Sequence, residues 1–357
     1  MKKDWFSLVL TGNLLNISLP LRNGYVMKRL IFIFSLMFLL VSCKKTSYEV
    51  LPEVEVEPVL FSDNLIMTPP LQMKDLKSHL VFVTPGMEQS LVFFDKKRQK
   101  TQAWGKIGNG PDDFTSAALV EYKDGKVKLF DSNLRKCVEY RLQLTDSVQL
   151  HRLHEYRYQS DSITLLNLHV MDNGMMVGFA GIGCAQMFVL LDSKMQQVKT
   201  FGTVPLNGLP EKNNLQLYGW FTSYKNKLFF ASQSMGYLVC FNIEDNQVTK
   251  EWEQFLTEPL YDLESRKWKK ENKYGFFDVV ANDKYVFAAF SGKSVTDSEK
   301  LIPQNVLVFT HEGKLVKNVR YRNAAIGKMA LSDDSKIYTI GGDELMCCDL
   351  QNWGLNE

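Results

Sequence analysis

The stretch VEYKDGKVKLFDSNLRKCVEYRLQLTDSVQLHRL, residues Val120–Leu153, contains one nearly complete unit of a pattern that recurs along the chain. It reads as the end of one strand, a tight turn at Asp124-Gly125, and strand-like segments at 126–130, 136–142 and 147–153. An Asp-Gly pair provides the positive φ angles that tight hairpins require. The segments are rich in Val, Leu, Phe and Tyr, which suit the pleated surface of a sheet. The stretch therefore predicts a four-stranded antiparallel meander.

Short polar turns between strand-like segments recur at intervals of about fifty residues, a period typical of repeat folds. The turns are Lys77-Ser78-His79, Lys123-Asp124-Gly125, Asp172-Asn173-Gly174, Lys225-Asn226-Lys227, Asn282-Asp283-Lys284 and Asp333-Asp334-Ser335. Third strands end on residues that favour a turn by bonding their own backbone, namely Asp95, Asp192, Asn242, Thr310 and Asp349. Six such units predict an all-β fold, a six-bladed β-propeller of four-stranded antiparallel blades. A sandwich built from many hairpins is the alternative.

The last unit lacks a fourth strand, because only LQNWGLNE follows Asp349. An open ring would expose a row of unpaired backbone groups at a sheet edge. We therefore expect VEVEPVLF, Val54–Phe61, to fold back as the outer strand of the last blade, with Pro58 tolerated at that edge. The propeller domain is predicted to span 53–357, with its two ends close together.

The overall charge of the chain is nearly balanced. It has 42 basic and 40 acidic residues in 357, a formal net charge of +2. This gives no general electrostatic reason for binding nucleic acid, so none is expected as a partner.

The segment that begins at Met27 has the features of a secretory signal peptide. Two cations precede an apolar run from Leu30 to Val41, and a small residue then precedes Cys43. The run is shorter than the roughly 20 residues that a membrane-spanning helix needs. The sequence around Cys43 resembles the lipobox of bacterial lipoproteins, which implies that its thiol carries a lipid and becomes the mature N-terminus.

This resemblance divides the start of the chain into three parts. We expect a lipoprotein signal peptide at 27–42 and a charged, proline-containing tether at 43–52. Acyl chains on Cys43 would hold the protein on a membrane of the cell envelope, expected to be the outer membrane, facing the periplasm or the exterior. Residues 1–26 add nothing to this signal and are interpreted as an extension from a start codon assigned too early.

The loop WGKIGNGPDDF, Trp104 to Phe114, raises the question of phosphate binding because it holds three glycines and a lysine. Its G-x-x-G-x-G spacing is the reverse of the dinucleotide fingerprint, and a strand-like segment follows rather than a helix. Asp112 and Asp113 would repel an anion. The loop is therefore predicted to be a structural turn between the first and second blades.

The same loop resembles the signature of TolB-like six-bladed propeller lipoproteins of Gram-negative envelopes. The matching positions are Gly105, Gly108, Gly110, Pro111, Asp113 and Phe114. Asp113 stands where that family more often has Glu. The resemblance extends from about Leu51 to the end of the chain, and it implies a fold and a location more than an activity.

Several polar residues lie on the predicted innermost strands, where propellers often place a site: Glu121, Asn167, His169, Asp278 and Lys328. Counted back from their hairpin turns, they lie at both odd and even offsets. Because strand side chains alternate between faces, we expect that the five do not all converge. No metal site, cofactor or catalytic residue is predicted from them.

Histidines and cysteines give no sharper signal. His151 and His154 would point to opposite faces of a strand and are interpreted as surface residues. Besides Cys43, the cysteines are Cys137, Cys184, Cys240, Cys347 and Cys348, whose pairing the sequence leaves open.

A long insertion, Thr257–Phe276, is the candidate binding loop. It places aromatic and basic side chains together at Tyr261, Arg266, Trp268, Lys269 and Tyr274, which suits a protein partner or an acidic glycan. A solvated insertion without a partner is the alternative. The sequence favours a non-catalytic binding or scaffolding propeller, and the alternative function is a lactonase-like hydrolase or lyase with a site at the channel mouth.

Overall fold

The computed structural model describes residues 51–62, 68–85, 88–297, 301–342 and 344–355. The expected signal peptide, the lipidation site Cys43 and residues 1–26 lie outside the described residues. The described residues belong to one unit of the chain, Ser47–Glu357. None of their helical segments has the length and hydropathy to cross a bilayer.

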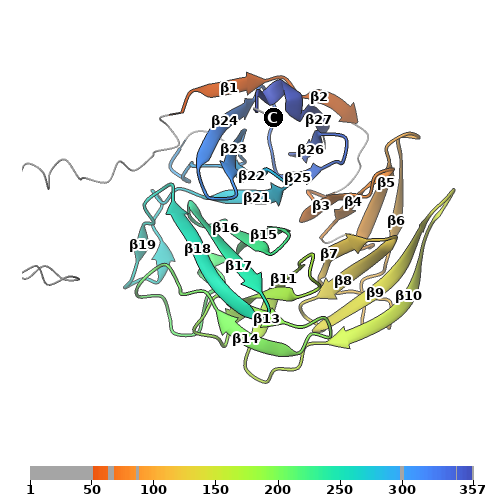
Figure 1. Cartoon of the computed structure of the whole chain (residues 1–357), viewed down its shortest axis with the longest axis horizontal. Helices are drawn as coiled ribbons and strands as arrows, with labels where there is room; N and C mark the ends of the chain where they lie inside the picture. Colours follow the sequence, from red (N-terminus) through yellow and green to blue (C-terminus); the bar gives the residue numbers. More distant parts are fainter. Residues whose placement is uncertain (1–50, 63–67, 86–87, 298–300, 343, 356–357) are drawn as a thin grey trace, which may run out of the picture. The chain divides into compact units, whose positions relative to one another are not determined.

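The first three blades follow one another along the chain, and each is a four-stranded antiparallel sheet (Figure 1). The first consists of β3 (Gln72–Asp75), β4 (His79–Val83), β5 (Leu91–Asp95) and β6 (Lys100–Trp104). The second consists of β7 (Ala117–Lys123), β8 (Lys126–Asp131), β9 (Lys136–Leu144) and β10 (Val148–Arg157). The third consists of β11 (Thr164–Val170), β12 (Met176–Ile182), β13 (Phe188–Leu191) and β14 (Gln197–Phe201).

The remaining three blades continue the same order of strands. The fourth consists of β15 (Gly219–Tyr224), β16 (Lys227–Ser232), β17 (Tyr237–Glu244) and β18 (Gln247–Phe255). The fifth consists of β21 (Phe276–Ala281), β22 (Tyr285–Phe290), β23 (Asn305–Thr310) and β24 (Leu315–Tyr321). The sixth contains β25 (Lys328–Leu331), β26 (Lys336–Ile340) and β27 (Leu345–Asp349). The predicted six-bladed propeller is confirmed, and the sandwich is not.

The last blade is closed by an N-terminal strand, as predicted. Strand β2 (Val59–Ser62) pairs antiparallel with β27 as its outer strand. The predicted span was wrong in one respect, because β1 (Glu53–Val56) instead pairs parallel with β24 of the fifth blade. Pro58 lies between β1 and β2, where its missing N–H and fixed φ allow the chain to leave one sheet and enter the next. The described N-terminal segment therefore joins the fifth and sixth blades, beside the C-terminal end of the chain (Figure 1).

Turn chemistry at the ends of the third strands follows the sequence prediction at Asp95 and Asp192, whereas the third strand of the fourth blade continues past Asn242 to Glu244. Asp95 Oδ1 accepts hydrogen bonds from the N–H groups of Lys97 and Arg98, both at 2.9 Å. Asp192 Oδ1 accepts from Lys194 and Gln196 at 2.8 Å. These carboxylates replace backbone acceptors at the point where each strand reverses.

Packing between neighbouring blades forms the core. Between the fourth and fifth blades, for example, Phe229 and Leu238 pack with Val286 and Leu307, all fully buried. Two 3-10 turns, η2 (Leu215–Leu217) and η3 (Leu350–Trp353), bury Leu217 and Trp353. The blades therefore hold their innermost strands in fixed positions around the centre of the ring.

Candidate functional site

All six innermost strands contribute to one cavity at the centre of the propeller. The cavity has a volume of about 270 Å³. In Figure 1 the strands β3, β7, β11, β15, β21 and β25 surround this centre. The polar side chains that line the cavity are Gln72, Lys74, Asp75, Asn167, His169, Thr222 and Asp278.

Lys74 is the cation at this cavity with the fewest partners. Its Nζ donates one long hydrogen bond, 3.4 Å, to the carbonyl oxygen of Val120. Within the described residues, no carboxylate oxygen lies within 4.0 Å of this Nζ. Burial lowers the pKa of Lys74, and the more distant carboxylates of Glu121 and Asp278 oppose that shift. An ammonium group has three donors, so Lys74 retains capacity for an acceptor that enters the cavity.

Asp278 and Lys328 form a second charged group, on adjacent blades. Asp278 accepts hydrogen bonds from the N–H groups of Val279 at 3.0 Å and Met329 at 2.8 Å. Lys328 Nζ donates to the carbonyl oxygen of Phe277 at 2.6 Å. Burial raises the pKa of the Asp278 carboxyl, against the opposing effect of the Lys328 charge. Burial also lowers the pKa of Lys328 to about 8, and Asp278 limits the change.

Trp220 also lines the cavity, and its indole Nε1 is enclosed by protein atoms. Lys328 Nζ lies 3.0 Å from the centre of the Trp220 ring, a cation–π contact. Trp220 is only 7% exposed, and its indole Nε1 has no hydrogen-bond partner among the residues that the structure describes. A buried N–H without an acceptor is costly unless a ligand or water satisfies it.

His169 presents a neutral ring. Its Nε2 lies 2.8 Å from Ser223 Oγ, and its ring stacks on Phe221 with centroids 6.3 Å apart. Burial lowers the pKa of His169 to about 3, and the Lys74 charge contributes. The imidazole is therefore uncharged near neutral pH, with one nitrogen that donates and one that accepts.

The prediction that the five polar residues do not all converge is confirmed, because Glu121 and Lys328 do not line the cavity. The argument from odd and even offsets was wrong. Asn167, His169 and Asp278 line one cavity although their offsets from the turn residues were both odd and even. The hairpin loops differ in extent, spanning 171–175 in one blade and 282–285 in the other. Counted from the last paired residues, Val170 and Ala281, all three lie an odd number of positions back. The other two residues make contacts elsewhere. Lys328 packs on the Trp220 ring, and Glu121 pairs with Lys128 at 2.6 Å.

Sequence reasoning missed Lys74, Trp220 and Ser223 as neighbours of the predicted residues. Lys74 lies on a strand of four residues, QMKD, which is too short to show alternation. The one feature of the sequence that could have identified Lys74 is its position, three residues before the first hairpin turn at Lys77. Trp220 and Ser223 lie on the innermost strand of the fourth blade, GWFTSY, in which half of the residues are aromatic and give the pattern of a core strand.

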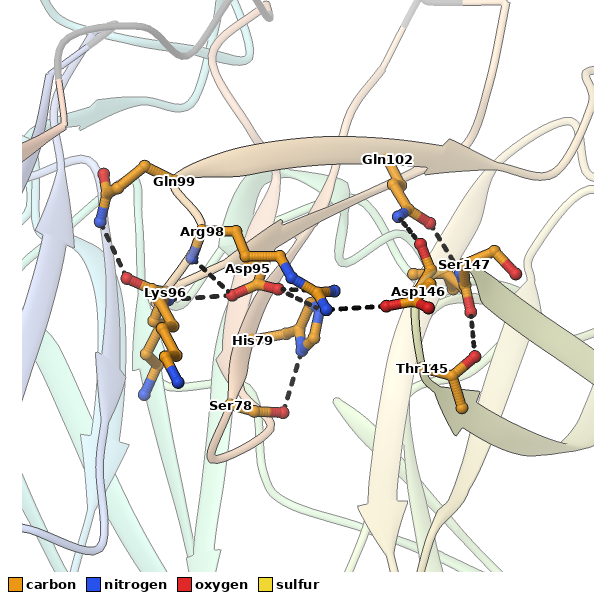
Figure 2. Close-up of polar contacts among 12 residues, drawn as sticks. Ser78, His79, Asp95, Lys96, Arg98, Gln99, Gln102, Thr145, Asp146 and Ser147 are labelled. Carbon is orange, nitrogen blue, oxygen red and sulfur yellow. Dashed lines mark hydrogen bonds and ion pairs between the residues drawn. The ribbon is translucent and has the colours of Figure 1, made fainter.

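A second polar cluster joins the first and second blades. Its Ser78, His79 and Asp95 stand in the order of a catalytic nucleophile, base and orienting acid. Figure 2 shows Ser78 Oγ 2.9 Å from His79 Nδ1, with Asp95 Oδ2 3.8 Å from His79 Nε2. The second distance is too long for a hydrogen bond. Arg98 also lies 3.6 Å from Asp95 and 2.7 Å from Asp146.

The surrounding contacts give this cluster a structural role. Gln102 of β6 donates from Nε2 to the carbonyl oxygen of Asp146 at 2.9 Å, and its Oε1 accepts from the N–H of Val148 at 2.6 Å (Figure 2). Burial lowers the pKa of His79, although Asp95 opposes the shift. One side chain of the first blade thus holds the β9–β10 hairpin of the second.

The glycine loop surrounds an internal cation. Lys136 Nζ donates to the carbonyl oxygens of Gly110 at 3.2 Å, Pro111 at 3.1 Å and Asp113 at 2.7 Å. The same Nζ lies 4.7 Å from the centre of the Phe114 ring. Gly105 has φ +84°, in the left-handed region that favours glycine. The loop offers oxygen acceptors to this ammonium.

The candidate binding loop contains a short hairpin, β19 (Tyr261–Asp262) and β20 (Lys267–Trp268). Tyr261 and Trp268 meet edge to face with ring centroids 5.2 Å apart, and Trp268 packs partly buried against the core. Tyr274 is half-buried, whereas Arg266 and Lys269 are exposed. Of the five predicted residues, these two cations are therefore the ones that present their side chains to solvent.

The described residues contain neither a disulfide nor a cluster of metal ligands. The five cysteines in the described residues, Cys137, Cys184, Cys240, Cys347 and Cys348, are all free thiols. No group of three or more His, Cys, Asp and Glu side chains in the described part of the chain is arranged to hold a metal ion.

Comparisons with known proteins support the fold. No protein-family model matches the sequence, and no curated protein matches it. Among solved structures, the chain is similar to a calcium-binding protein, regucalcin, from Agrobacterium tumefaciens (TM-score 0.51, 11% identity, 82% of this chain and 93% of that one). It is also similar to a luciferin-regenerating enzyme (TM-score 0.50, 11% identity, 81% and 94%). A third structure is a putative exported protein from Bacteroides fragilis (TM-score 0.50, 10% identity, 84% and 86%). At these identities the likeness shows the propeller fold alone.

Proposed function

We propose that this chain is a lipid-anchored envelope protein whose propeller binds a ligand in its central cavity without catalysing a reaction. The observation that carries the proposal is the meeting of Lys74, His169 and Asp278 at a cavity lined by all six blades. Lys74 retains unused donors, because its Nζ makes one long hydrogen bond. Unused donors in a cavity can bind a molecule of complementary shape and charge.

The location rests on separate support. The signal segment and the lipobox before Cys43 suggest export and lipidation. Two resemblances support this location. One is the loop motif, which resembles that of TolB-like envelope lipoproteins, and the other is the similarity to an exported Bacteroides fragilis protein. We include membership of the TolB-like family in the proposal.

A metal-dependent, lactonase-like enzyme fits the charges of the cavity less well. A calcium ion takes six to eight oxygen ligands, typically including several carboxylates. Here Asp278 already accepts two backbone N–H groups, and Asp75 pairs with Lys96 at 2.7 Å. The Lys74 ammonium group at the same cavity would repel a divalent cation.

Binding can be tested on the lipoprotein expressed with its own signal and extracted in mild detergent. Native mass spectrometry should find a small molecule held by the wild-type propeller. Val280→Phe places a larger side chain at the cavity and should abolish retention, whereas Val198→Phe on the exposed outer strand of the third blade should not. A wild-type protein that holds no molecule, or equal retention in both variants, would contradict the proposal.

Anchoring can be tested independently. Metabolic labelling with an alkyne fatty acid should mark the wild-type protein in the membrane fraction, and Cys43→Ser should lose both the label and the membrane association. Cys137→Ser is the matched control, because this thiol is buried in the propeller. Undiminished labelling of Cys43→Ser would show that the lipid is attached elsewhere.

A further inference from the structure

The central cavity carries an excess of positive charge. Glu121 pairs with Lys128, and Asp75 pairs with Lys96, so these two pairs are neutral. His169 is neutral because of its burial. Lys74 and Asp278 remain among the lining residues. Asp278 interacts with the charges of both Lys74 and Lys328, and Lys328 lies against the Trp220 ring beside the cavity. At least one positive charge is therefore uncompensated at the centre of the ring.

The uncompensated charge is concentrated on Lys74. Lys328 has a 2.6 Å hydrogen bond, an aromatic face and the charge of Asp278. Lys74 has one 3.4 Å hydrogen bond. A buried charge without a close partner is unfavourable in a low-dielectric site, and an entering anion removes that cost.

The rest of the cavity suits an uncharged body. Phe221, Val280 and Leu331 line it beside the polar groups. Trp220, on the fourth blade, is three blades from Lys74 on the first and so lies across the ring from it. The neutral His169 offers a hydrogen bond that does not require a second charge on the ligand.

The size of the cavity limits the ligand. A volume of about 270 Å³ is just below the roughly 300–1,000 Å³ that is usual for drug-sized ligands. At about 30 Å³ for each water, it holds the equivalent of roughly nine water molecules. A molecule of a few carbon atoms with one acidic group fits this space.

We infer that the central cavity binds a small organic acid as its monoanion, with the carboxylate on Lys74 and the uncharged remainder against Phe221, Val280 and Leu331. The inference rests on the proposed binding function and names the class of ligand. A second negative charge on the ligand would meet Asp278 and the apolar wall without a cation to pair with. The site therefore selects for one negative charge.

Three probes of equal carbon number test the charge rule on the unaltered protein. Hexanoate, hexanamide and the dianion adipate are titrated into the detergent-solubilised lipoprotein by calorimetry, after exchange to remove any bound molecule. Hexanoate should bind at least tenfold more tightly than hexanamide and than adipate. Inorganic phosphate, titrated in parallel, distinguishes a general anion site from a site for organic acids, and it should bind more weakly than hexanoate.

Lys74 is tested with two substitutions and a control. Lys74→Met should weaken hexanoate binding at least tenfold, and Lys74→Arg should retain most of it. Lys77→Met removes an exposed cation three residues away and should change nothing. Because the comparison of hexanoate with hexanamide needs no substitution, a Lys74→Met protein that fails to fold leaves the inference testable.

The outcomes separate this inference from the proposed function. If hexanamide or phosphate binds as tightly as hexanoate and Val280→Phe abolishes binding, the cavity is a binding site but the monoanion rule is wrong. The rule is also wrong if Lys74→Met binds hexanoate normally. If no probe binds and the native protein retains no molecule, both the inference and the proposed function are wrong.

Discussion

Lys136 Nζ donates a 2.7 Å hydrogen bond to the main-chain carbonyl oxygen of Asp113, in the loop that most resembles a phosphate site in the sequence. Two further carbonyl oxygens, those of Gly110 and Pro111, accept from the same ammonium. The loop therefore turns its acceptors toward a cation that the second blade supplies. A phosphate would need the opposite arrangement, with N–H groups directed at the ligand.

Replacing Lys136 by Met should destabilise the propeller. The side chain is 2% exposed, and its loss leaves carbonyl oxygens of the loop without a donor, at a cost of about 2 kcal/mol or more. Thermal unfolding of the variant should show a lower midpoint, and addition of inorganic phosphate should not shift the wild-type midpoint through this loop. Lys194→Met, at an exposed turn, is the control. An unchanged midpoint for Lys136→Met would contradict the structural role of the loop.

Gly110→Ala should destabilise the protein for reasons of space. A Cβ at Gly110 would lie 2.6 Å from Asp113 Oδ2, and one at Gly108 would lie 2.5 Å from the same atom. That oxygen accepts a hydrogen bond from the N–H of Gly110 at 3.0 Å. The added methyl would displace the carboxylate and break this bond, with a cost of about 1–3 kcal/mol.

A double-mutant cycle identifies the cause. If the clash with Asp113 accounts for the loss, the effects of Gly110→Ala and Asp113→Ala on the free energy of unfolding should not add, since the second change removes the obstruction. Denaturant unfolding of the two single variants and the double variant gives the coupling. Additive effects would show that Gly110 is required for another reason.

Removing the N-terminal strands in two steps should separate their roles. An internal deletion of 51–57 removes β1 and leaves the fifth blade with its four antiparallel strands. A deletion of 51–62 also removes β2, so that β27 becomes an open edge and Phe61 no longer packs on Tyr338, at a centroid distance of 5.2 Å. Open edges promote aggregation.

The longer deletion should lower the melting temperature much more than the shorter one, and it should aggregate in light scattering. Both deletions retain Cys43, so that the proposed lipidation site is present in the two proteins. Equal melting temperatures for the two deletion variants would mean that β2 does not close the ring.

The blades were predictable because their signals are local. A turn such as Asp124-Gly125 fixes its hairpin through the φ angles of two residues, and Asp95 stabilises its turn through two adjacent N–H groups. The closing of the last blade followed from a missing strand. The transfer of Glu53–Val56 to the fifth blade could not be predicted, because an edge strand chooses between two sheets through contacts that are distant in sequence, such as Glu55 with Arg322 at 2.8 Å.

The cavity was harder to predict because it depends on register. Ladder irregularities lie between Leu165 and Asn167 and between Phe276 and Asp278, beside two of the residues that line it. A bulge or a longer hairpin changes which residues share a face, and neither is visible in a single sequence. The presence of polar residues on innermost strands could be predicted, and their convergence could not.

Acid should destabilise the protein through His169. Its pKa is about 3 in the folded protein and near 6.5 when exposed, so the unfolded chain binds one more proton between these values. Stability from this group is complete above pH 6.5 and is lost as the pH falls, by about 1.4 kcal/mol for each pH unit. His169→Gln should reduce the slope between pH 6 and pH 4 in urea unfolding.

His151→Gln is the matched control, because His151 lies exposed on β10 and should leave the slope unchanged. The nearby Lys74 charge contributes to the low pKa of His169, so Lys74→Met should reduce the slope in part. A His169→Gln protein with the same acid slope as wild type would mean that this ring is not held neutral by its surroundings.

The candidate binding loop should divide into an anchor and a contact surface. Trp268 packs on the core and meets Tyr261, so Trp268→Ala should lower the melting temperature, at a cost of about 2–4 kcal/mol for a large, partly buried ring. Arg266 and Lys269 are exposed, and replacing both with Ser should leave the melting temperature unchanged. If the loop recognises a protein or an acidic glycan, the double replacement should weaken capture of a partner from a membrane extract, or retention of the protein on a heparin matrix in low salt. Lys194→Ser and Lys97→Ser together are the control, because they remove the same charge from other exposed positions. Equal retention of the two double variants would show that this loop is a solvated insertion.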